Sequence, residues 1–516
     1  MASSFSPLKF LFLFLFLLSF PFSNARNHHG ENSHDVSSST GGILAKKRAE
    51  KLIKSFNLSP KGPVSTCHAD TSISESEEAP GIVEKQFKFH SLLETGPSIQ
   101  NLGHHAGYYK LSHSKAARMF YFFFESRKSK RDPVVIYLTG GPGCSSSLSL
   151  FYEMGPFHIT KNLSLVWNEY GWDQASNLLF VDQPIGTGFS YTTNDEDYVS
   201  DEEGVSNDLY DFLQAFFRHH PEFVNNDFYI TGESYAGHYI PALAGRIHKG
   251  NKANEGIHIN FKGMAIGNGL TNSAIQFAAY PDYALNMSLI NQSDYYNIEK
   301  LVPNCVNSAK ACESGGGNTT CVSSLETCQP IFDKILLIAG NINYYDIRKK
   351  CEGRPLCYDF SAIEIFLNEK SVKEALGVGN ITFVSCSTDV SDRMEGDRMK
   401  NLAVGIPELL EDGIRVLVYV GEYDLVCNWL GNSRWVNALN WSGQKDFLAA
   451  PMVPFVVDGE EAGKLKTHGP LSFLKVHNAG HLVPMDQPKN SLQMLKRWIE
   501  GKLALQHSER TAPNPK

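Results

Sequence analysis

The 516-residue sequence lacks an excess of basic charge: it has 47 Lys and Arg against 55 Asp and Glu, and it contains no long run of Lys and Arg. Without a basic face there is little to attract a phosphate backbone, so we expect no nucleic-acid partner. After the N-terminal region, the sequence also lacks apolar runs of membrane-spanning length. The remaining composition, 42% hydrophobic and 11% aromatic, is typical of a globular protein with a large core.

Residues 1–25 have the pattern of a secretory signal peptide. Lys9 precedes a mainly apolar stretch from Phe10 to Phe22, and the small residues Ser23 and Ala25 follow it. The alternative, an N-terminal anchor, is disfavoured because the apolar stretch is short for a bilayer. We therefore expect cleavage after Ala25, no membrane association after signal removal, and a protein that is secreted or delivered to the vacuolar lumen.

Residues 26–84 differ in composition from the rest of the chain. They are largely polar and of low complexity, apart from one helical stripe between Leu44 and Phe56. We interpret this segment as a prosegment with an approximate boundary. The alternative is a disordered tail with one incidental helix, and neither interpretation places chemistry here.

The rest of the chain predicts an α/β fold with an insertion. In residues 85–272 and again in 386–506, strand-like runs such as "DPVVIYL" and "IRVLVYV" alternate with helical patterns, which is the signature of a mostly parallel sheet covered by helices. Residues 273–385 hold six of the ten cysteines and little strand alternation. We expect them to form a cap inserted into one α/β domain, and residues 507–516 to form a flexible tail.

The stretch "NDFYITGESYAGHYIPALAGRI" predicts a nucleophile elbow at Ser234. An apolar strand, a serine with small neighbours and a helical pattern follow one another, which is the context that lifts a nucleophilic hydroxyl out of a sheet. The match to G-x-S-x-G is imperfect, because Gly232 fits but Ala236 holds the last position and glycine follows at Gly237.

An acid and a base for this serine come later in the chain, in the order that α/β-hydrolases use. Asp424 follows the strand that ends at Val420, and His481 follows the strand that ends at Val476. Loops at the carboxyl ends of parallel strands are where such sites are built. Each residue alone is more often a turn former or a satisfied polar group, but the ordered trio predicts a catalytic triad.

The turn "TGGPG" after the strand ending at Leu138 offers donors for a developing oxyanion. We expect the N–H groups of Gly141 and of Tyr235, the residue after the nucleophile, to form the oxyanion hole. The alternative is a turn without a catalytic role.

Five motifs in order, "GGPGCSS", "DQPIGTGFSY", "GESYAGHY", "DLVCNWLGN" and "GHLVPMDQP", resemble those of the serine carboxypeptidases. The resemblance extends from about Leu102 to Leu503. It implies an α/β-hydrolase fold with a helical cap, and release of C-terminal amino acids at acidic pH. It also implies that Glu233, beside the nucleophile, reads the free carboxylate of the substrate, which requires one of the two carboxyl groups to be protonated.

The chain departs from the family pattern where Trp-Leu-Asn-Gly-Gly is usual and Tyr137-Leu138-Thr139-Gly140-Gly141 stands instead. Threonine keeps a hydroxyl donor but lacks the reach of the carboxamide. Carboxylate recognition is therefore expected to depend on Glu233 and the Gly140 N–H, with Thr139 in support. The resemblance further assigns Tyr137, Cys427 and Leu482 to the substrate pocket, where Leu482 favours apolar leaving residues.

The resemblance also orders the cysteines. It implies disulfides between Cys305 and Cys328, Cys312 and Cys321, Cys351 and Cys357, and Cys144 and Cys386. Cys427 then remains a thiol near Asp424, and Cys67 leaves with the prosegment.

Seven Asn-x-Ser/Thr acceptors accompany the signal peptide. We exclude Asn57 and Asn440, which are crowded by proline or tryptophan, and expect glycosylation at Asn162, Asn286, Asn291, Asn318 and Asn380.

The sequence therefore predicts a serine carboxypeptidase that acts on peptides with a free C-terminus, without cofactor or metal. One alternative is an acyltransferase that uses the same triad with an activated ester. A second is a non-catalytic glycoprotein that retains the fold as a binding partner. The intact motif "GESYAG", which keeps the carboxylate-reading glutamate, disfavours the first alternative, and the intact catalytic motifs disfavour the second.

Overall fold

The computed structural model describes residues 83–88, 103–163, 165–351 and 355–503. The predicted signal peptide, Cys67, the predicted tail and all but the last two residues of the predicted prosegment lie outside these ranges. Those two residues, Val83 and Glu84, belong to the first strand. No helix among the described residues combines the length and the apolar character needed to cross a bilayer.

One 11-stranded sheet runs through the molecule in the order β1-β2-β3-β7-β4-β8-β9-β12-β15-β14-β13. Its six central strands, from β7 to β15, are parallel, and antiparallel strands extend both edges. The strands are β1 Val83–Lys88, β2 Gly103–Lys110, β3 Arg118–Phe124, β4 Val134–Leu138, β7 Asn177–Val181, β8 Phe228–Glu233, β9 Phe261–Gly267, β12 Arg415–Gly421, β13 Val453–Val457, β14 Glu460–His468 and β15 Leu471–Val476. The predicted α/β-hydrolase architecture is confirmed.

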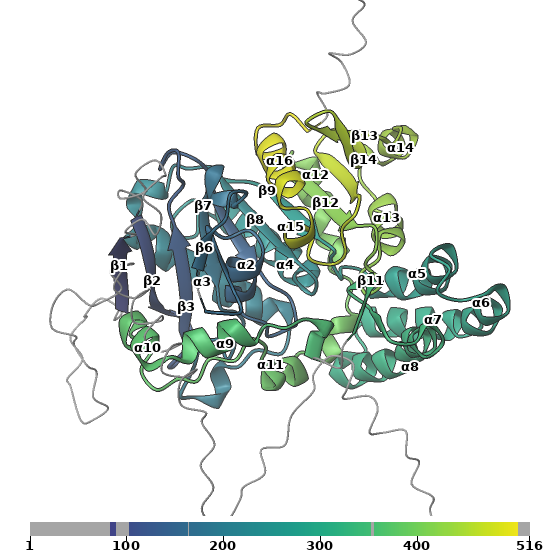
Figure 1. Cartoon of the computed structure of the whole chain (residues 1–516), viewed down its shortest axis with the longest axis horizontal. Coiled ribbons are helices and arrows are strands. Elements are labelled where there is room, and N and C mark those ends of the chain that lie inside the picture. The colour runs from purple at the N-terminus through teal and green to yellow at the C-terminus, as the bar shows by residue number, and fades with distance from the viewer. Residues whose placement is uncertain (1–82, 89–102, 164, 352–354, 504–516) are drawn as a thin grey trace, which may run out of the picture.

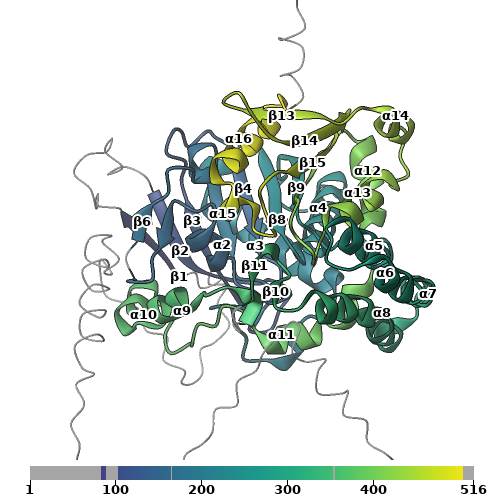
Figure 2. The same cartoon turned by 45° about the vertical axis from the view of Figure 1, so that its right-hand side comes forward.

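Helices cover both faces of this sheet (Figures 1 and 2). They are α2 Ser147–Tyr152, α3 Glu202–His219, α4 Ala236–Ala253, α9 Ser361–Asn368, α10 Lys370–Leu376, α11 Thr388–Arg393, α12 Ile406–Glu411, α13 Trp429–Asn437, α14 Gln444–Ala449, α15 Val483–Asp486 and α16 Pro488–Ile499. Local sequence explains their ends: in α3 the Asp201 side chain accepts from the N–H of Gly204, and Arg218 and His219 lie in the last turn, where cations complement the helix dipole.

The core is divided by the sheet into two apolar clusters. In β4, Val135 and Tyr137 belong to one cluster, whereas Val134, Ile136 and Leu138 belong to the other. Successive side chains of a strand point to opposite faces, so a strand with helices on both sides is apolar throughout. The first face packs against α2 and α16, and the second face packs against α3 and α4.

The predicted cap, residues 273–385, is split between two places. Its first part forms a helical bundle with its own apolar cluster, built from α5 Ser273–Asn286, α6 Gln292–Glu299, α7 Val302–Glu313 and α8 Gly317–Ala339. The second part, with helices α9 and α10, packs instead into the first core cluster of the main domain, far from α5–α8 (Figure 1).

Two short two-stranded sheets lie outside the main sheet. One pairs β5 Phe157–Ile159 with β6 Leu165–Trp167, and the other pairs β10 Ile342–Asn343 with β11 Asp346–Lys350.

Candidate active site

Ser234 occupies the sharp turn between β8 and α4. Its φ angle is +63°, in the left-handed region that few residues other than glycine adopt. The turn requires small neighbours, because a Cβ added to Gly232 would lie 2.2 Å from the Leu138 carbonyl oxygen and one added to Gly237 would lie 2.4 Å from the Leu270 carbonyl oxygen. Glycine is therefore needed at both positions 232 and 237. Ser234 itself is half-buried and reaches two cavities.

Asp424 and His481 lie in loops that follow β12 and β15, neighbouring parallel strands. The imidazole Nδ1 is 2.7 Å from Oδ2 of Asp424, and both side chains are buried. Within the described part of the chain, Nε2 of His481 has no hydrogen-bond partner although it is buried. His481 and Ser234 line the same cavity. An imidazole with one nitrogen held by an acid and the other available beside a serine has the arrangement of a general base.

Asp424 is also held by Asn268, a residue that the sequence alone did not indicate. Asn268, directly after β9, donates from Nδ2 to Oδ2 of Asp424 at 2.7 Å, and its Oδ1 accepts from the N–H of Gly421 at 3.1 Å. The N–H of Cys427 also donates to Oδ2, at 3.2 Å. Asn268 has a φ of +40°, a conformation that asparagine tolerates. The available signal was its place at the carboxyl end of a parallel strand.

The glycine turn after β4 packs directly against the nucleophile. A Cβ on Gly140 would lie 2.4 Å from the Tyr235 N and 2.7 Å from the Ser234 Cβ, so no larger residue fits. Gly141 has a φ of +117°. Gly141, Ser234 and Tyr235 line one cavity together. The two predicted oxyanion donors, Gly141 and Tyr235, therefore border the same cavity as Ser234.

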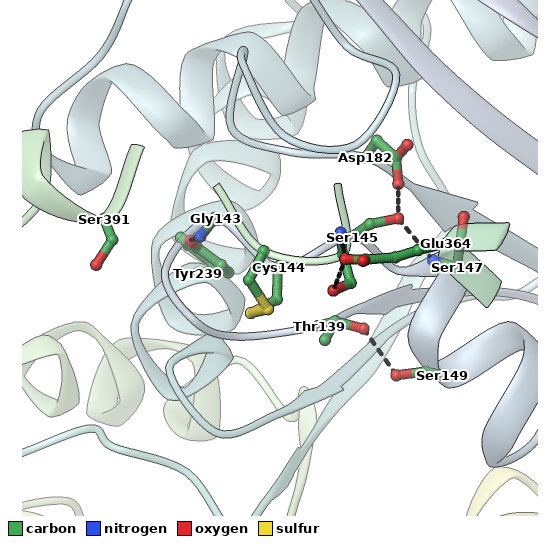
Figure 3. Close-up of a disulfide and its surroundings, with 12 residues drawn as sticks. Thr139, Gly143, Cys144, Ser145, Ser147, Ser149, Asp182, Tyr239, Glu364 and Ser391 are labelled. Carbon is green, nitrogen blue, oxygen red and sulfur yellow. Dashed lines mark hydrogen bonds between the residues drawn. A yellow bond between two sulfur atoms is a disulfide. The ribbon is translucent and has the colours of Figure 1, made fainter. Parts of the chain in front are cut away.

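A disulfide anchors this turn to the segment before α11 (Figure 3). Cys144 and Cys386 are bonded and also form a β-bridge, flanked by backbone hydrogen bonds from Ser145 N–H to the Ser385 carbonyl and from Ser387 N–H to the Gly143 carbonyl, both 2.8 Å. Three further disulfides join cysteines of the described ranges, Cys305–Cys328, Cys312–Cys321 and Cys351–Cys357, and these four pairs are those that the resemblance implied.

Asp182 also supports this turn, through hydrogen bonds from Ser145 and Phe189. The hydroxyl of Ser145 donates to its carboxyl group, and so does the N–H of Phe189, at 2.9 Å. Burial raises the pKa of Asp182 to about 7, against the opposing effect of these hydrogen bonds.

Glu233 has a second carboxyl group beside it, that of Glu153, which directly follows α2 and also lies in the wall of the first cavity. We call Glu233 and Glu153 the carboxyl pair. Both side chains are buried, and one oxygen of each carboxyl group has no hydrogen-bond partner among the described residues. Burial raises the pKa of Glu233 well above its usual range, and repulsion from Glu153 raises it further. Burial also raises the pKa of Glu153. In the sequence, Glu153 is marked only by being a single acid within the apolar run "LSLFYEMG", so local patterns did not indicate a role for it.

Thr139 continues this polar wall. Its Oγ1 is 2.7 Å from Oγ of Ser149, a neighbour of Glu153 on α2 (Figure 3). Thr139 and Gly140 both line the cavity with Glu233. Protonated carboxyl groups, a hydroxyl and a nearby N–H can together bind an anionic carboxylate.

The first cavity, of about 710 Å³, continues from this polar wall into an apolar pocket. The large side chains that line the pocket are Leu148, Tyr152, Tyr345, Leu356, Tyr358, Phe360 and Leu482. Leu482 is among these lining residues, and its role in selecting the leaving residue stays a prediction. Tyr137 is a correction: it is fully buried and packs against Trp172, because it lies on a central strand beneath the site and the cavity begins two residues later, at Thr139.

A second cavity, of about 560 Å³, is also lined by Ser234 and Gly141 and extends to the helices α5 and α8. Cys427 lines this second cavity and not the first. It is a buried thiol, and burial raises its pKa well above the usual range, with repulsion from Asp424 as a second cause.

Comparison with known proteins gives a consistent result. The family model described as serine carboxypeptidase matches residues 95–501. "Serine carboxypeptidase-like 48" of Arabidopsis thaliana is 62% identical over 475 residues, covering 91% of this chain and 92% of that protein. "Serine carboxypeptidase 3" of Hordeum vulgare is 59% identical over 460 residues, covering 88% and 90%. Among solved structures, a prohormone-processing carboxypeptidase from Saccharomyces cerevisiae superposes with a TM-score of 0.70 at 28% identity, covering 77% of this chain and 91% of that one.

Proposed function

The chain belongs to the serine carboxypeptidase family and is a serine-type carboxypeptidase, and on that premise we propose that it releases C-terminal amino acids from peptides through an acyl-enzyme on Ser234. This assignment is carried by the position of His481, whose Nδ1 is hydrogen-bonded to Oδ2 of Asp424 at 2.7 Å and which lines the same cavity as Ser234. The other site residues act around this pair.

In the proposed reaction, Ser234 Oγ attacks the carbonyl carbon of the last peptide bond while Nε2 of His481 accepts its proton. Asp424 stabilises the imidazolium, and the N–H groups of Gly141 and Tyr235 stabilise the oxyanion. The imidazolium then protonates the leaving amino group, and the C-terminal residue departs. Water, deprotonated by His481, hydrolyses the acyl-enzyme and regenerates the serine.

The restriction of cleavage to the last residue of the peptide follows from the carboxyl pair, Glu233 and Glu153. We assign Glu233 and Glu153, with Thr139 and the Gly140 N–H, to the free carboxylate of the substrate. Raised pKa values keep these side chains protonated at acidic pH, where they can donate to an anionic carboxylate. Acidic pH is therefore the proposed working range. A blocked or amidated C-terminus makes fewer of these contacts and binds less well.

The leaving residue is proposed to be apolar. Its side chain would enter the pocket formed by Tyr345, Tyr358, Phe360 and Leu482. No lysine or arginine is found among the described residues that line this cavity. The two acids that line it, Glu153 and Glu233, are assigned in this proposal to the terminal carboxylate. Release of Phe and Leu should therefore be faster than release of Lys or Arg.

The alternative functions are not favoured. An acyltransferase does not require a carboxyl pair that binds a free terminal carboxylate. A non-catalytic binding protein does not require an intact general base beside a serine. The decisive experiment compares the wild type with Ser234→Ala on N-blocked dipeptides ending in Phe, with a glucose ester as a parallel substrate. We expect release of Phe by the wild type alone, at least about 10⁴-fold above the variant. Preferential transfer from the ester would refute the assignment, and so would fluorophosphonate labelling at another serine.

The cellular route is also part of the proposal. We infer removal of residues 1–25 as a signal peptide and of residues 26–84 as a prosegment, leaving a protein in the vacuolar lumen or outside the cell. Four disulfides support an oxidising compartment. The five proposed glycosylation sites, Asn162, Asn286, Asn291, Asn318 and Asn380, are all exposed. N-terminal sequencing and endoglycosidase treatment of the protein purified from its native tissue test this route.

A further inference from the structure

Tyr235, the residue after the nucleophile, has a buried side chain in addition to its proposed oxyanion N–H. The residue is only 3% exposed. Its ring stacks on His238, with centroids 4.7 Å apart, and meets the ring of Tyr239 edge to face at 5.1 Å. A ring that is packed in this way moves little. The position of the Tyr235 backbone therefore depends on what holds the far end of the ring.

The far end of the ring is held by Asp397. The hydroxyl group of Tyr235 donates to Oδ2 of Asp397 at 2.7 Å. The other oxygen, Oδ1, is 2.9 Å from Nζ of Lys400 and accepts from the N–H of Glu202, the first residue of α3, at 3.3 Å. Asp397 is buried, and these three donors compensate its charge. Its carboxyl group thus joins Tyr235 to α3 and to the 3₁₀ turn Gly396–Met399 that carries Asp397.

The turn that carries Asp397 is fixed to the segment that also holds the nucleophile. Oγ of Ser273, the first residue of α5, donates to the carbonyl oxygen of Arg398 at 2.5 Å. In the same segment, the N–H of Leu270 donates to the carbonyl oxygen of Ser234 at 2.9 Å. Asp397 itself lines neither cavity. It therefore belongs to the support of the active site and makes no contact with a substrate there.

A hydrogen bond from a buried tyrosine can also serve the fold alone, and Tyr210 on α3 provides the comparison. Tyr210 is buried, and its hydroxyl donates to the carbonyl oxygen of Glu255, after α4, at 2.5 Å. It lines neither cavity. A neutral backbone carbonyl is sufficient as the acceptor there. The acceptor for Tyr235 is instead a buried carboxyl group, whose charged form is costly to bury unless it is compensated.

We propose that Asp397 is a positioning residue for the oxyanion hole: by holding the hydroxyl of Tyr235, it fixes the direction of the Tyr235 N–H toward the oxyanion. Donors of an oxyanion hole stabilise the transition state because they are oriented before the reaction, so a small displacement weakens this stabilisation more than it weakens substrate binding. The loss should therefore appear in kcat and not in KM. This proposal rests on the proposed function, since it uses the oxyanion role of Tyr235.

The test uses Tyr235→Phe, which removes the hydroxyl and keeps the ring and the N–H. The measurements are kcat and KM on an N-blocked dipeptide ending in Phe, and the second-order rate constant for fluorophosphonate labelling of Ser234. Labelling requires the nucleophile and the oxyanion hole but no peptide. We expect kcat and the labelling rate to fall about tenfold. KM should stay within about twofold of the wild-type value.

The matched control is Tyr210→Phe, which also removes one buried tyrosine hydroxyl and its hydrogen bond. It should leave kcat, KM and the labelling rate unchanged. This control separates the loss of a buried hydrogen bond in general from the loss of the bond that positions the oxyanion donor.

Substitutions at Asp397 assign the effect to this residue. Asp397→Ala removes the acceptor and should lower kcat about as much as Tyr235→Phe, which is about tenfold. Asp397→Asn keeps an acceptor oxygen for the Tyr235 hydroxyl and should retain at least about a third of the wild-type kcat. The double variant Tyr235→Phe/Asp397→Ala should be slower than the slower single variant by no more than about twofold, because both substitutions remove the same bond.

The outcomes separate this proposal from the assigned reaction. Wild-type kcat and labelling in Tyr235→Phe would overturn the positioning role and leave the carboxypeptidase activity standing. Losses that multiply in the double variant, or equal losses in Tyr235→Phe and Tyr210→Phe, would do the same. A wild-type protein that is labelled at Ser234 but releases no Phe would overturn the proposed function, and the labelling rates would then decide the role of Asp397. If Asp397→Ala does not fold, Tyr235→Phe and its control decide the question alone.

Discussion

Asn268 donates a hydrogen bond to the same oxygen of Asp424, Oδ2, that binds Nδ1 of His481, and both distances are 2.7 Å. Asp424 is fully buried, and its other carboxyl oxygen has no hydrogen-bond partner among the described residues. Asn268 thus orients the acid that orients the base. It is a positioning residue that does not line either cavity.

The substitution Asn268→Asp tests this role, because aspartate keeps the shape and tolerates the positive φ angle. A second carboxyl group beside Asp424 replaces a donor by an acceptor and adds negative charge, which favours the protonated form of His481. We expect kcat to fall about 10- to 100-fold with KM nearly unchanged, and the acid limb of the kcat profile to move to higher pH. A loss of activity without any movement of the acid limb would indicate a purely structural role.

Glu233 should make the activity depend on pH in a defined direction. Because its pKa is raised, the carboxyl group is protonated at acidic pH and ionises as the pH rises; it then repels the substrate carboxylate. We therefore expect kcat/KM on a blocked dipeptide acid to decline toward neutral pH, even though deprotonation of the base favours the reaction over the same range.

The variant Glu233→Gln carries a permanent amide donor. It should lose about tenfold activity at acidic pH, where the neutral acid is a good donor, and decline less steeply toward neutrality. Wild-type hydrolysis of the corresponding dipeptide amide should likewise decline less. The measurement is kcat/KM against pH for both proteins on both substrates. Four parallel profiles would mean that Glu233 does not read the carboxylate.

Stability should also fall as pH rises, and Glu202 is the residue that tests this. It is buried at the start of α3, neither of its carboxyl oxygens has a hydrogen-bond partner among the described residues, and Asp397 lies beside it. Burial raises the pKa of Glu202 well above its usual range, and repulsion from Asp397 raises it further, against the favourable charge of Lys400. Between the unfolded and folded pKa values the native state binds more protons, so unfolding becomes easier as the pH rises.

We expect Glu202→Gln to be more stable than the wild type by about 1–2 kcal/mol at pH 7.5 and nearly equal at pH 4.5. Thermal unfolding at the two pH values measures the difference. The matched control is Glu203→Gln, on the adjacent exposed residue of the same helix, which should change the melting temperature little at either pH. Equal stability of wild type and Glu202→Gln at pH 7.5 would contradict the prediction.

The Cys144–Cys386 disulfide should matter for both stability and catalysis, because it joins segments 242 residues apart and lies three residues after Gly141. Replacing both cysteines by alanine should lower the free energy of unfolding by about 2–5 kcal/mol. It should also lower kcat by about tenfold, since the oxyanion turn loses its anchor.

The comparison variant removes Cys312–Cys321, which closes a span of only nine residues in the cap. Its removal should lower the free energy of unfolding less than removal of Cys144–Cys386, because the disulfide of the shorter loop restricts the unfolded chain less. Its kcat should remain at the wild-type level. Chemical denaturation and kcat on a blocked dipeptide distinguish the two variants, and equal effects on kcat would argue against a role for the disulfide in holding the oxyanion turn.

Much of this site was predictable from the sequence because its parts are local patterns. The elbow at Ser234 requires an apolar strand, small neighbours and a helix within one continuous stretch. Asp424 and His481 each follow an apolar strand, and parallel strands bring their carboxyl ends to one edge of a sheet. The family motifs implied the disulfide pairs that the structure contains.

Other parts depended on contacts between segments that no local pattern relates. Glu153, directly after α2, and Glu233, at the end of β8, meet only in the wall of one cavity. Asn268 reaches Asp424 because β9 and β12 are neighbours in the sheet. Asp397 reaches the Tyr235 hydroxyl from a 3₁₀ turn, Gly396–Met399, that has no strand or helix signal of its own.

The expectation that Tyr137 lines the substrate pocket failed for the same reason, because local sequence does not show which side chains reach the cavity. In the sequence it is close to Thr139 and the glycine turn, but it still belongs to β4, where it packs against Trp172 beneath the site. The sequence by itself determined which residue types carry the chemistry, their order and the strands that hold them, because these follow from short-range periodicity and turn geometry. Only the tertiary structure decided which side chains share a cavity and which buried acids lie side by side, because packing across the sheet sets those distances.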